Sequence, residues 1–273
     1  MSTIEVNGTR LYYEDTGPGS TGETIVFSHG LLWSAEMFEP QIAALRGRYR
    51  CIAWDHRGQG RSAEDHRNTI GIELVWHDAM HLIEQLVGPR TPVHFCGLSM
   101  GGFVAMRTAA FRPELVRSLL LLETSADPEP LENVGRYRML TRAVRLFGPR
   151  VVMSRVLPIM LGQAILTDPA RRGEVERFAG LMSRRRDIWR AVNGVIDRAA
   201  VHGELQRITA PTLILVGEED VATRPEKSER LAAGIRGSKL VRIPRAGHSS
   251  TVEEPASVTA AIESFLSTLP PIR

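Results

Sequence analysis

Short apolar runs recur along the first half of the chain and again along its last quarter, separated by stretches with helical periodicity. Runs of this length are typical of buried strands, and strands that alternate with helices indicate a mostly parallel sheet. The pattern predicts eight strands, over residues 4–7, 11–15, 24–27, 50–54, 93–98, 115–122, 212–216 and 239–243. Helices are predicted over residues 37–45, 70–87, 100–111, 226–235 and 256–266. The sequence therefore predicts an α/β protein with helices on both faces of an eight-stranded sheet.

Asn7-Gly8 separates the first two apolar runs. This dipeptide favours the type I′ turn of a two-residue β-hairpin, because both of its residues tolerate a positive φ. The run 115–122 is mainly apolar, as expected for a strand that helices cover on both faces. We therefore predict that one hairpin joins an otherwise mostly parallel sheet.

The alternation of strands and helices stops after Glu123 and resumes at Thr212. Residues 125–204 have no clear strand pattern and contain 14 Arg against 9 Asp and Glu. A helical insertion between two halves of one sheet is the simplest explanation. We predict a core made of residues 1–124 and 205–273, with residues 125–204 forming a helical cap.

The composition, 43% hydrophobic and 24% charged, is that of an ordinary globular protein. Neither a membrane helix, which needs about eighteen apolar residues, nor a signal peptide is expected. The net charge is +3, and no basic run is interleaved with aromatics, so no nucleic-acid partner is expected. Cys51 and Cys96 lie in predicted strands, which favours buried thiols and a cytoplasmic location.

The run 93–98 leads into Gly97-Leu98-Ser99-Met100-Gly101, which matches the pattern G-x-S-x-G and is followed by a helical stretch. A serine on such a strand-to-helix turn adopts strained backbone angles, so its neighbours must lack bulky side chains. The turn holds the hydroxyl clear of the sheet edge, with the amide of the next residue beside it. Ser99 is therefore the candidate nucleophile.

A serine hydroxyl needs a base at neutral pH, and histidine is suited to that role. His248 lies in a loop of small residues between the last predicted strand and the last helix. Such loops at the carboxyl ends of parallel strands are where open α/β sheets bind ligands. We take His248 as the candidate base. Structural or solvent-exposed positions are expected for His56, His66, His77, His81, His94 and His202.

The base in turn needs an acid that fixes its tautomer and stabilises the imidazolium ion. The run 212–216 ends in Gly217-Glu218-Glu219-Asp220, just where such an acid should project. Asp220 is our choice, because the glycine permits a turn and the aspartate follows three residues later. Glu218 and Glu219 are competitors, each better explained as a solvated loop charge. Asp127, just after the run that ends at residue 122, is a further alternative.

An oxyanion that forms on the substrate needs two hydrogen-bond donors. The backbone amide of Met100 is one candidate. The other is the amide of Leu31, in the loop His29-Gly30-Leu31 that follows the run 24–27. We also expect His29, Gly30 and Trp33, in or beside this loop, to lie at the substrate pocket.

These motifs resemble those of the α/β-hydrolase superfamily over nearly the whole chain. The matching pieces are His29-Gly30-Leu31, Asp55-His56-Arg57-Gly58-Gln59-Gly60-Arg61-Ser62, Gly97-Leu98-Ser99-Met100-Gly101-Gly102, Gly217-Glu218-Glu219-Asp220 and Gly247-His248. The order Ser99, Asp220, His248 is the order of that superfamily. The second piece is similar to the D-x-R-G-x-G-x-S loop, which is structural, with Gln59 where His is often found.

Within the superfamily, the stretch 28–41 and the elbow look most like 3-oxoadipate enol-lactonases and related small esterases. Those lactonases often have Asn-Ser in place of His29-Gly30. The resemblance implies a serine hydrolase of a small carboxylic ester or lactone that uses water and needs no cofactor or metal. The insertion corresponds to the cap that covers the site. A monomer or small homo-oligomer without a membrane or nucleic-acid partner is expected.

Two other activities on the same triad stay open, those of a perhydrolase-type haloperoxidase and of a C–C bond hydrolase. The difference between them lies in the pocket. A ligand sensor that keeps the hydrolase fold but turns over slowly is a third alternative, of another class. The serine at the elbow is unlike haloalkane dehalogenases and epoxide hydrolases, which attack with aspartate.

Overall fold

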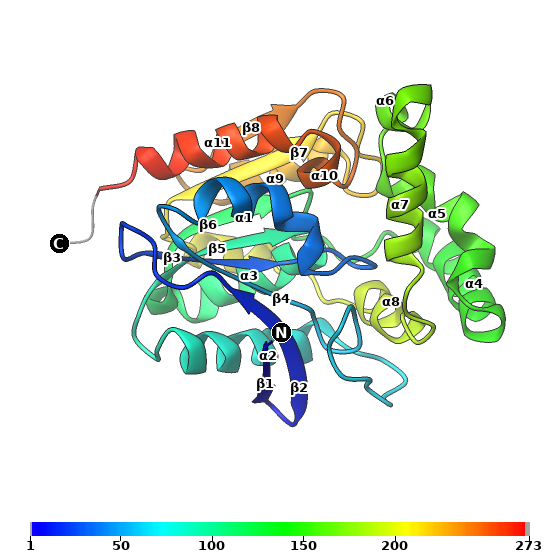
Figure 1. Cartoon of the computed structure of the whole chain (residues 1–273), viewed down its shortest axis with the longest axis horizontal. Helices are drawn as coiled ribbons and strands as arrows, with labels where there is room; N and C mark the ends of the chain where they lie inside the picture. Colours follow the sequence, from blue (N-terminus) through cyan, green and yellow to red (C-terminus); the bar gives the residue numbers. More distant parts are fainter. Residues whose placement is uncertain (1, 271–273) are drawn as a thin grey trace.

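The eight predicted strands pair into a single sheet in the order β1-β2-β4-β3-β5-β6-β7-β8 in the computed structural model, which describes residues 2–270 (Figure 1). Their bounds are β1 Ser2–Val6, β2 Thr9–Asp15, β3 Thr24–Ser28, β4 Arg50–Trp54, β5 Val93–Leu98, β6 Val116–Leu122, β7 Thr212–Gly217 and β8 Lys239–Ile243. The eight-stranded α/β fold expected from the sequence is confirmed. No strand end differs from its predicted position by more than two residues.

The first two strands form the predicted hairpin at one edge of the sheet. β1 pairs with β2 and β2 with β4 in antiparallel fashion, and every other neighbouring pair is parallel. At the hairpin turn, φ is 45° at Asn7 and 70° at Gly8, the two positive values that a type I′ turn requires. A parallel sheet places the carboxyl ends of its strands at one edge, where the site is built.

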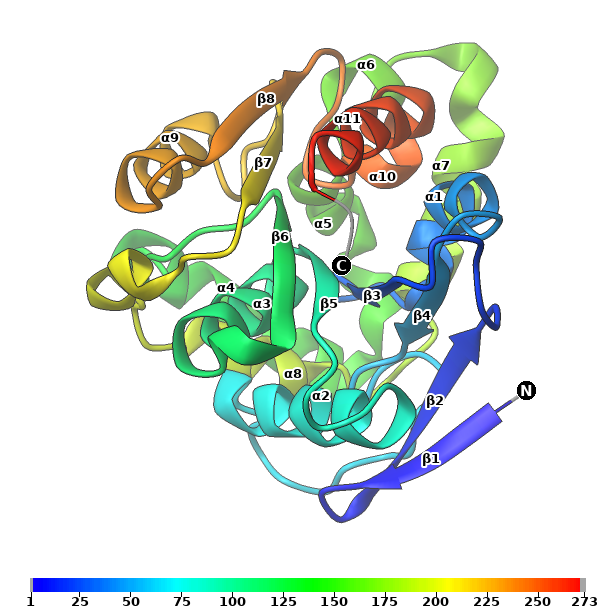
Figure 2. The same cartoon turned by 90° about the vertical axis from the view of Figure 1, so that its left-hand side faces the viewer.

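Helices cover both faces of the sheet, as Figure 2 shows. One face packs against α2 (Ile72–Leu86), α3 (Met100–Phe111) and α9 (Pro225–Gly234), and the other against α1 (Glu39–Leu45) and α11 (Pro255–Ser267). Side chains of β6 alternate between these two cores, with Leu119 and Leu121 in the first and Leu120 and Leu122 in the second. A strand buried on both faces therefore needs apolar residues at consecutive positions, which explains the mainly apolar run of β6.

Residues 125–204 contain helices and no strand, and Figure 1 shows these helices gathered at one side of the sheet. They are α4 (Leu131–Phe147), α5 (Met153–Met160), α6 (Gln163–Leu166), α7 (Arg172–Met182) and α8 (Trp189–Ile196), with 3-10 turns between them. A small apolar cluster that includes Val144 and Trp189 joins α4 to α8 and packs against Leu31 and Leu32. The division into core and cap stays a prediction. Residues 1 and 271–273 of the predicted core lie outside the described residues.

Both cysteines are free and buried, Cys51 in β4 and Cys96 in β5. Burial raises the pKa of the Cys51 thiol to about 12 and raises that of Cys96 as well. Within residues 2–270, no helix has both the length and the apolar character needed to cross a membrane.

Candidate active site

Ser99 occupies a tight turn between β5 and α3, with φ 51° and ψ −109°. A positive φ is strained for a residue with a side chain, and it persists only where the surroundings enforce it. Here the enforcement is close packing: a Cβ added at Gly97 would lie 2.3 Å from the Gly101 carbonyl oxygen. A Cβ added at Gly101 would lie 1.9 Å from the carbonyl oxygen of Ser28 in β3. The two glycines of the motif are therefore required because backbone passes against backbone on both sides of the serine.

Three of the predicted site residues lie in one hydrogen-bonded line. The Ser99 hydroxyl is 2.8 Å from His248 Nε2, and His248 Nδ1 is 2.9 Å from Asp220 Oδ2. The serine is 8% exposed, the histidine 4% and the aspartate 3%. The sequence separations are 149 and 28 residues, so the fold alone brings these groups together. Such a line can accept a proton from the serine at His248 Nε2 while Nδ1–H donates to the aspartate.

Asp220 is held as an acceptor by donors from its own loop. Its Oδ1 accepts from the amides of Ala222, at 2.8 Å, and Thr223, at 2.9 Å. Its Oδ2 accepts from the Thr223 hydroxyl at 2.7 Å, besides its bond to His248. Burial by itself would raise the pKa of Asp220, but His248 and the Thr223 donors outweigh it and lower that pKa. The carboxylate form of Asp220 is therefore favoured, and this is the form that can stabilise a protonated His248.

The competing acids from the sequence have other partners. The carboxylate of Glu219 accepts from the Ala164 amide of α6 at 2.8 Å, and Glu218 is exposed. Asp127 pairs with His202 and Arg230. Glu218, Glu219 and Asp127 therefore do not bond to His248, whereas Asp220 does.

The loop after β3 passes close to the serine. A Cβ added at Gly30 would lie 2.9 Å from a side-chain carbon of Leu98 and 3.7 Å from the Cβ of Ser99. Within residues 2–270, the amides of Leu31 and Met100 donate to no protein acceptor. Both amides are therefore available as the two expected oxyanion donors.

Gln59 links the two loops that carry those amides. Its side-chain oxygen accepts from the Leu32 amide at 3.2 Å, and its nitrogen lies 3.4 Å from the sulfur of Met100. The sequence pattern places Gln59 in a structural loop, but these two contacts depend on the tertiary structure. The residue that departs from the family pattern thus contacts both halves of the candidate oxyanion site.

His29, Gly30 and Trp33 were expected at the substrate pocket, but none of them is among the residues that line the cavity beside Ser99. His29 is fully buried, stacked on the ring of His56 at 3.9 Å, and its Nε2 accepts from the His56 amide at 2.8 Å. Trp33 is 2% exposed, donates to the Ser249 hydroxyl and packs edge-on against Phe178 of α7. The side chains of His29 and Trp33 are thus taken up by contacts with other buried groups. Gly30 lies close to Leu98 and Ser99 and has no side chain of its own.

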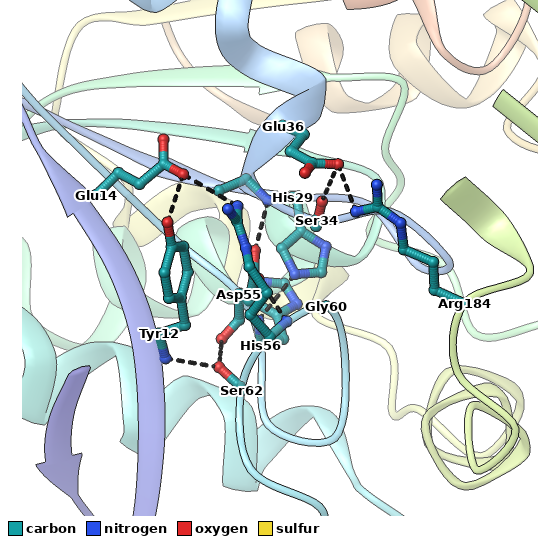
Figure 3. Close-up of polar contacts among 12 residues, drawn as sticks. Tyr12, Glu14, His29, Ser34, Glu36, Asp55, His56, Gly60, Ser62 and Arg184 are labelled. Atoms are coloured by element: carbon teal, nitrogen blue, oxygen red, sulfur yellow. Dashed lines mark hydrogen bonds and ion pairs between the residues drawn. The ribbon is translucent and has the colours of Figure 1, made fainter. Parts of the chain in front are cut away.

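Figure 3 shows hydrogen bonds that hold the loop 55–62 in place next to β2 and the loop after β3. Asp55 Oδ1 accepts from the Ala35 amide and its Oδ2 from the Arg61 amide, each at 2.7 Å. The Ser62 hydroxyl donates to the Asp55 carbonyl and accepts from the Tyr12 amide. A Cβ at Gly60, where φ is 50°, would lie 2.3 Å from the Asp55 carboxylate. The structural role expected for this loop agrees with these bonds.

A cavity opens between Ser99 and the helices of residues 125–204, and its wall is predominantly apolar. Leu31, Leu32, Val144, Met153, Ile188 and Val192 are among its lining residues, with Ser99 and His248 on one side. Glu129, Tyr137 and Arg198 add polar atoms. Within residues 2–270, no group of three or more His, Cys, Asp or Glu side chains is arranged to hold a metal ion.

Glu253, in the short helix α10 (Ser250–Glu253), is a further residue of the site, and the sequence pattern gives no sign of it. Its Oε2 accepts from the amides of Gly162, at 2.7 Å, and Gly247, at 3.1 Å, and its Oε1 from Ser249 at 2.9 Å. Burial raises the pKa of this carboxyl, and the three amides oppose that rise. No local pattern marks a glutamate for this role, since one of its partners is 91 residues away.

The sheet order, the serine elbow after β5 and the inserted helices define an α/β hydrolase. The chain belongs to the serine aminopeptidase S33 family, whose model matches residues 19–255. It is 30% identical over 266 residues to the RutD protein of Variovorax paradoxus (strain S110), to which a carbamate hydrolase activity is ascribed. That match covers 94% of this chain and 96% of the relative.

Two solved structures extend the likeness. A thermophilic esterase from Thermogutta terrifontis is 27% identical, with a TM-score of 0.90 over 98% of this chain and 99% of that one. The enol-lactonase of Burkholderia xenovorans LB400 is 26% identical, with a TM-score of 0.87 over 97% and 100%. The superfamily and the similarity to esterases and lactonases expected from the sequence are confirmed.

Proposed function

We propose that this chain is a serine hydrolase that cleaves a small carboxylic ester or lactone through an acyl-enzyme. The observation that carries the proposal is the continuous line Ser99–His248–Asp220 at the wall of an apolar cavity. A hydroxyl bonded to a buried imidazole, which is in turn oriented by a carboxylate, is the arrangement of an activated nucleophile. The apolar wall favours an aliphatic or aromatic acyl group over a charged one, because a buried charge needs a partner.

In the proposed reaction, His248 Nε2 takes the proton of Ser99 as its Oγ attacks the carbonyl carbon. The oxyanion accepts hydrogen bonds from the amides of Leu31 and Met100, and Asp220 stabilises the imidazolium. The proton then passes from Nε2 to the leaving alkoxide, which departs as an alcohol from an ester and stays attached to the acyl group from a lactone. Water then attacks the acyl-enzyme, His248 takes its proton and returns it to Ser99 Oγ, and the acid is released. The balance needs water alone, so we propose a cofactor-free enzyme.

The RutD likeness supports a second substrate class, carbamates. A carbamate carbonyl can acylate a serine in the same way, so the same three residues would serve both. The predominantly apolar cavity favours the ester, because a carbamoyl nitrogen brings hydrogen-bond donors that need partners there. Hydrolysis of p-nitrophenyl butyrate and p-nitrophenyl carbamate, compared by kcat/KM, separates the two. We expect the butyrate to be preferred, and a reversed preference would transfer the proposal to carbamates.

The test of the nucleophile uses Ser99→Ala and a matched serine outside the cavity, Ser34→Ala. We expect Ser99→Ala to lose nearly all hydrolysis of p-nitrophenyl butyrate, and a fluorophosphonate to label Ser99 in the unmodified protein by mass spectrometry. Ser34→Ala should keep both properties. Full turnover by Ser99→Ala, or labelling at another serine, contradicts the proposal. A protein that binds esters but never turns them over would instead fit a ligand sensor.

We further propose a cytoplasmic enzyme, acting as a monomer or small homo-oligomer without nucleic-acid or membrane partners. Two free, buried cysteines support this location, since the reducing cytoplasm keeps thiols unpaired. Fractionation of cells with an antibody against the chain tests the location.

A further inference from the structure

The cavity beside Ser99 has a polar end within its otherwise apolar wall. Arg198, in the segment after α8, and Glu129, just before α4, form an ion pair at 2.8 Å. The exposed fractions of their side chains are 2% and 9%. Both residues and Tyr137 of α4 line the cavity that holds Ser99 and His248. α4 and α8, in or next to which these residues lie, are neighbours in Figure 1.

Stability alone is a poor explanation for this pair. Replacing a buried ion pair by packed apolar residues is often neutral or stabilising, because two charges lose their hydration when buried. An apolar cavity wall could have been completed by leucine or methionine at both positions. A charged pair kept in such a wall therefore points to a ligand that uses it.

The pair leaves hydrogen-bond donors for a ligand. Both oxygens of Glu129 already accept a hydrogen bond, Oε2 from Arg198 Nη1 and Oε1 from Asn133 Nδ2 at 3.0 Å. Arg198 uses Nε on the Asp127 carbonyl and Nη1 on Glu129 and the Val195 carbonyl. Within residues 2–270, its Nη2 donates to no protein acceptor. The hydroxyl of Tyr137 accepts from Arg136 at 3.4 Å, and it likewise donates to none in that part of the chain.

The polar end belongs to the same cavity as the nucleophile, with Phe103 next to it. The guanidinium carbon of Arg198 is 4.6 Å from the ring centre of Phe103. Phe103 is four residues after Ser99 at the start of α3, and its amide donates to the Ser99 carbonyl. Ser99, Phe103 and Arg198 all line the same cavity. A substrate whose carbonyl reaches Ser99 can therefore also contact Arg198.

We propose that Arg198 Nη2 and the Tyr137 hydroxyl form a subsite for an uncharged oxygen acceptor on the acyl chain, such as a keto oxygen. The proposed substrate class is therefore an ester or lactone of an oxo-substituted acid, and this rests on the proposed hydrolase function. A neutral oxygen is favoured over a carboxylate, because Glu129 already neutralises Arg198 and would repel a second carboxylate.

The test compares p-nitrophenyl 5-oxohexanoate with p-nitrophenyl hexanoate, which lacks only the oxo oxygen. We expect kcat/KM to be about tenfold or more higher for the oxo ester, the ratio that one hydrogen bond from a charged donor supplies. Tyr137→Phe and the double variant Arg198→Met/Glu129→Leu should bring the ratio close to one. The double variant avoids leaving either charge buried alone. A merely structural role would lower both rates together and leave the ratio unchanged.

Thr141→Val is the matched control, because its hydroxyl also belongs to a cavity-lining residue but donates to the Tyr137 carbonyl. The ratio should persist in this variant. Equal rates for the two esters in the unmodified protein overturn the subsite while leaving the hydrolase proposal intact. A preference for the p-nitrophenyl monoester of adipic acid, which ends in a carboxylate, overturns the neutral-acceptor assignment.

A second measurement does not depend on turnover. Calorimetry on the Ser99→Ala protein compares N-phenyl-5-oxohexanamide with N-phenylhexanamide. We expect tighter binding of the oxo amide by about tenfold, lost when Tyr137→Phe is added. Equal affinities overturn the subsite. If the oxo amide binds tighter but neither ester is hydrolysed, the subsite stands and the proposed hydrolysis fails.

Discussion

Glu253 lies five residues after His248, and its carboxylate accepts hydrogen bonds from the amides on both sides of that histidine. The same carboxylate also bonds to Gly162, between α5 and α6. One side chain therefore positions the loop of the candidate base and attaches it to the inserted helices.

We predict that Glu253→Gln lowers stability by about 1–3 kcal/mol, because an amide NH₂ would face backbone donors in place of an acceptor. The turnover number should fall more than KM rises, since the loop holds His248 rather than the substrate. Urea unfolding and ester kinetics measure the two effects. Glu254→Gln is the control, because it removes the same charge from a half-buried side chain that faces Arg171 and Arg245. Equal losses in both variants would show that charge, not the amide contacts, matters.

We predict that Asp220→Asn lowers kcat by about 10²–10⁴-fold while the protein remains folded. An asparagine can offer its NH₂ to His248 Nδ1 and so stabilise the wrong tautomer of the imidazole. Circular dichroism and p-nitrophenyl butyrate kinetics test this. Asp127→Asn serves as the comparison, since that aspartate pairs with His202 and Arg230. If Asp127→Asn were the more damaging of the two, the acid would have been assigned to the wrong strand.

Two glycine substitutions should act in opposite directions. Gly101→Ala places a methyl group 1.9 Å from a backbone oxygen of β3, so we expect a loss of about 1–3 kcal/mol and of activity. Gly135→Ala, inside α4, meets nothing within 4 Å, so we expect a gain of about 0.5–1 kcal/mol. Thermal and urea unfolding compare the two. A neutral Gly101→Ala would mean that the elbow can open without cost.

We predict that the buried carboxyl of Glu123 makes the stability of the fold depend on pH. Burial, with a contribution from the charges of Asp220 and Glu253, raises the pKa of this carboxyl well above its ordinary value. Because the folded state binds the proton more tightly than the unfolded state, the contribution of Glu123 to the free energy of unfolding is fully present at low pH. This contribution to stability is lost as pH rises from the ordinary pKa of 4.5 towards the higher folded pKa, with a slope of at most about 1.4 kcal/mol per pH unit.

Glu123→Gln replaces the carboxyl by an amide that does not titrate. The free energy of unfolding of this variant should therefore decline less between pH 5 and pH 8 than that of the unmodified protein. Urea unfolding across this range measures the difference. Glu132→Gln, at an exposed position of α4, controls for the loss of one negative charge. Parallel pH profiles for Glu123→Gln and the unmodified protein would contradict the raised pKa.

Much of the fold and of the candidate site was predictable, because the relevant signals are local. The period and length of apolar runs depend on which faces of a strand are buried, so the eight strands could be located from sequence. The Asn7-Gly8 turn and the glycines around Ser99 reflect backbone angles and close approaches that only small residues allow. Asp220 and His248 follow strand ends, and parallel strands bring such ends together at one edge of the sheet.

Only the tertiary structure decided which side chains surround the serine. Sequence position next to the oxyanion loop suggested Trp33 for the pocket, yet its ring packs against Phe178 and is not among the residues that line the cavity. The pair of Arg198 and Glu129 spans 69 residues, and Glu253 reaches Gly162 across 91. Local pattern determines strands and turns through backbone geometry, whereas contacts between distant segments depend on how the helices of residues 125–204 pack over the sheet. The sequence by itself therefore determined the candidate nucleophile and its candidate partners, because their signals are local, and the packing of distant segments decided which side chains surround them.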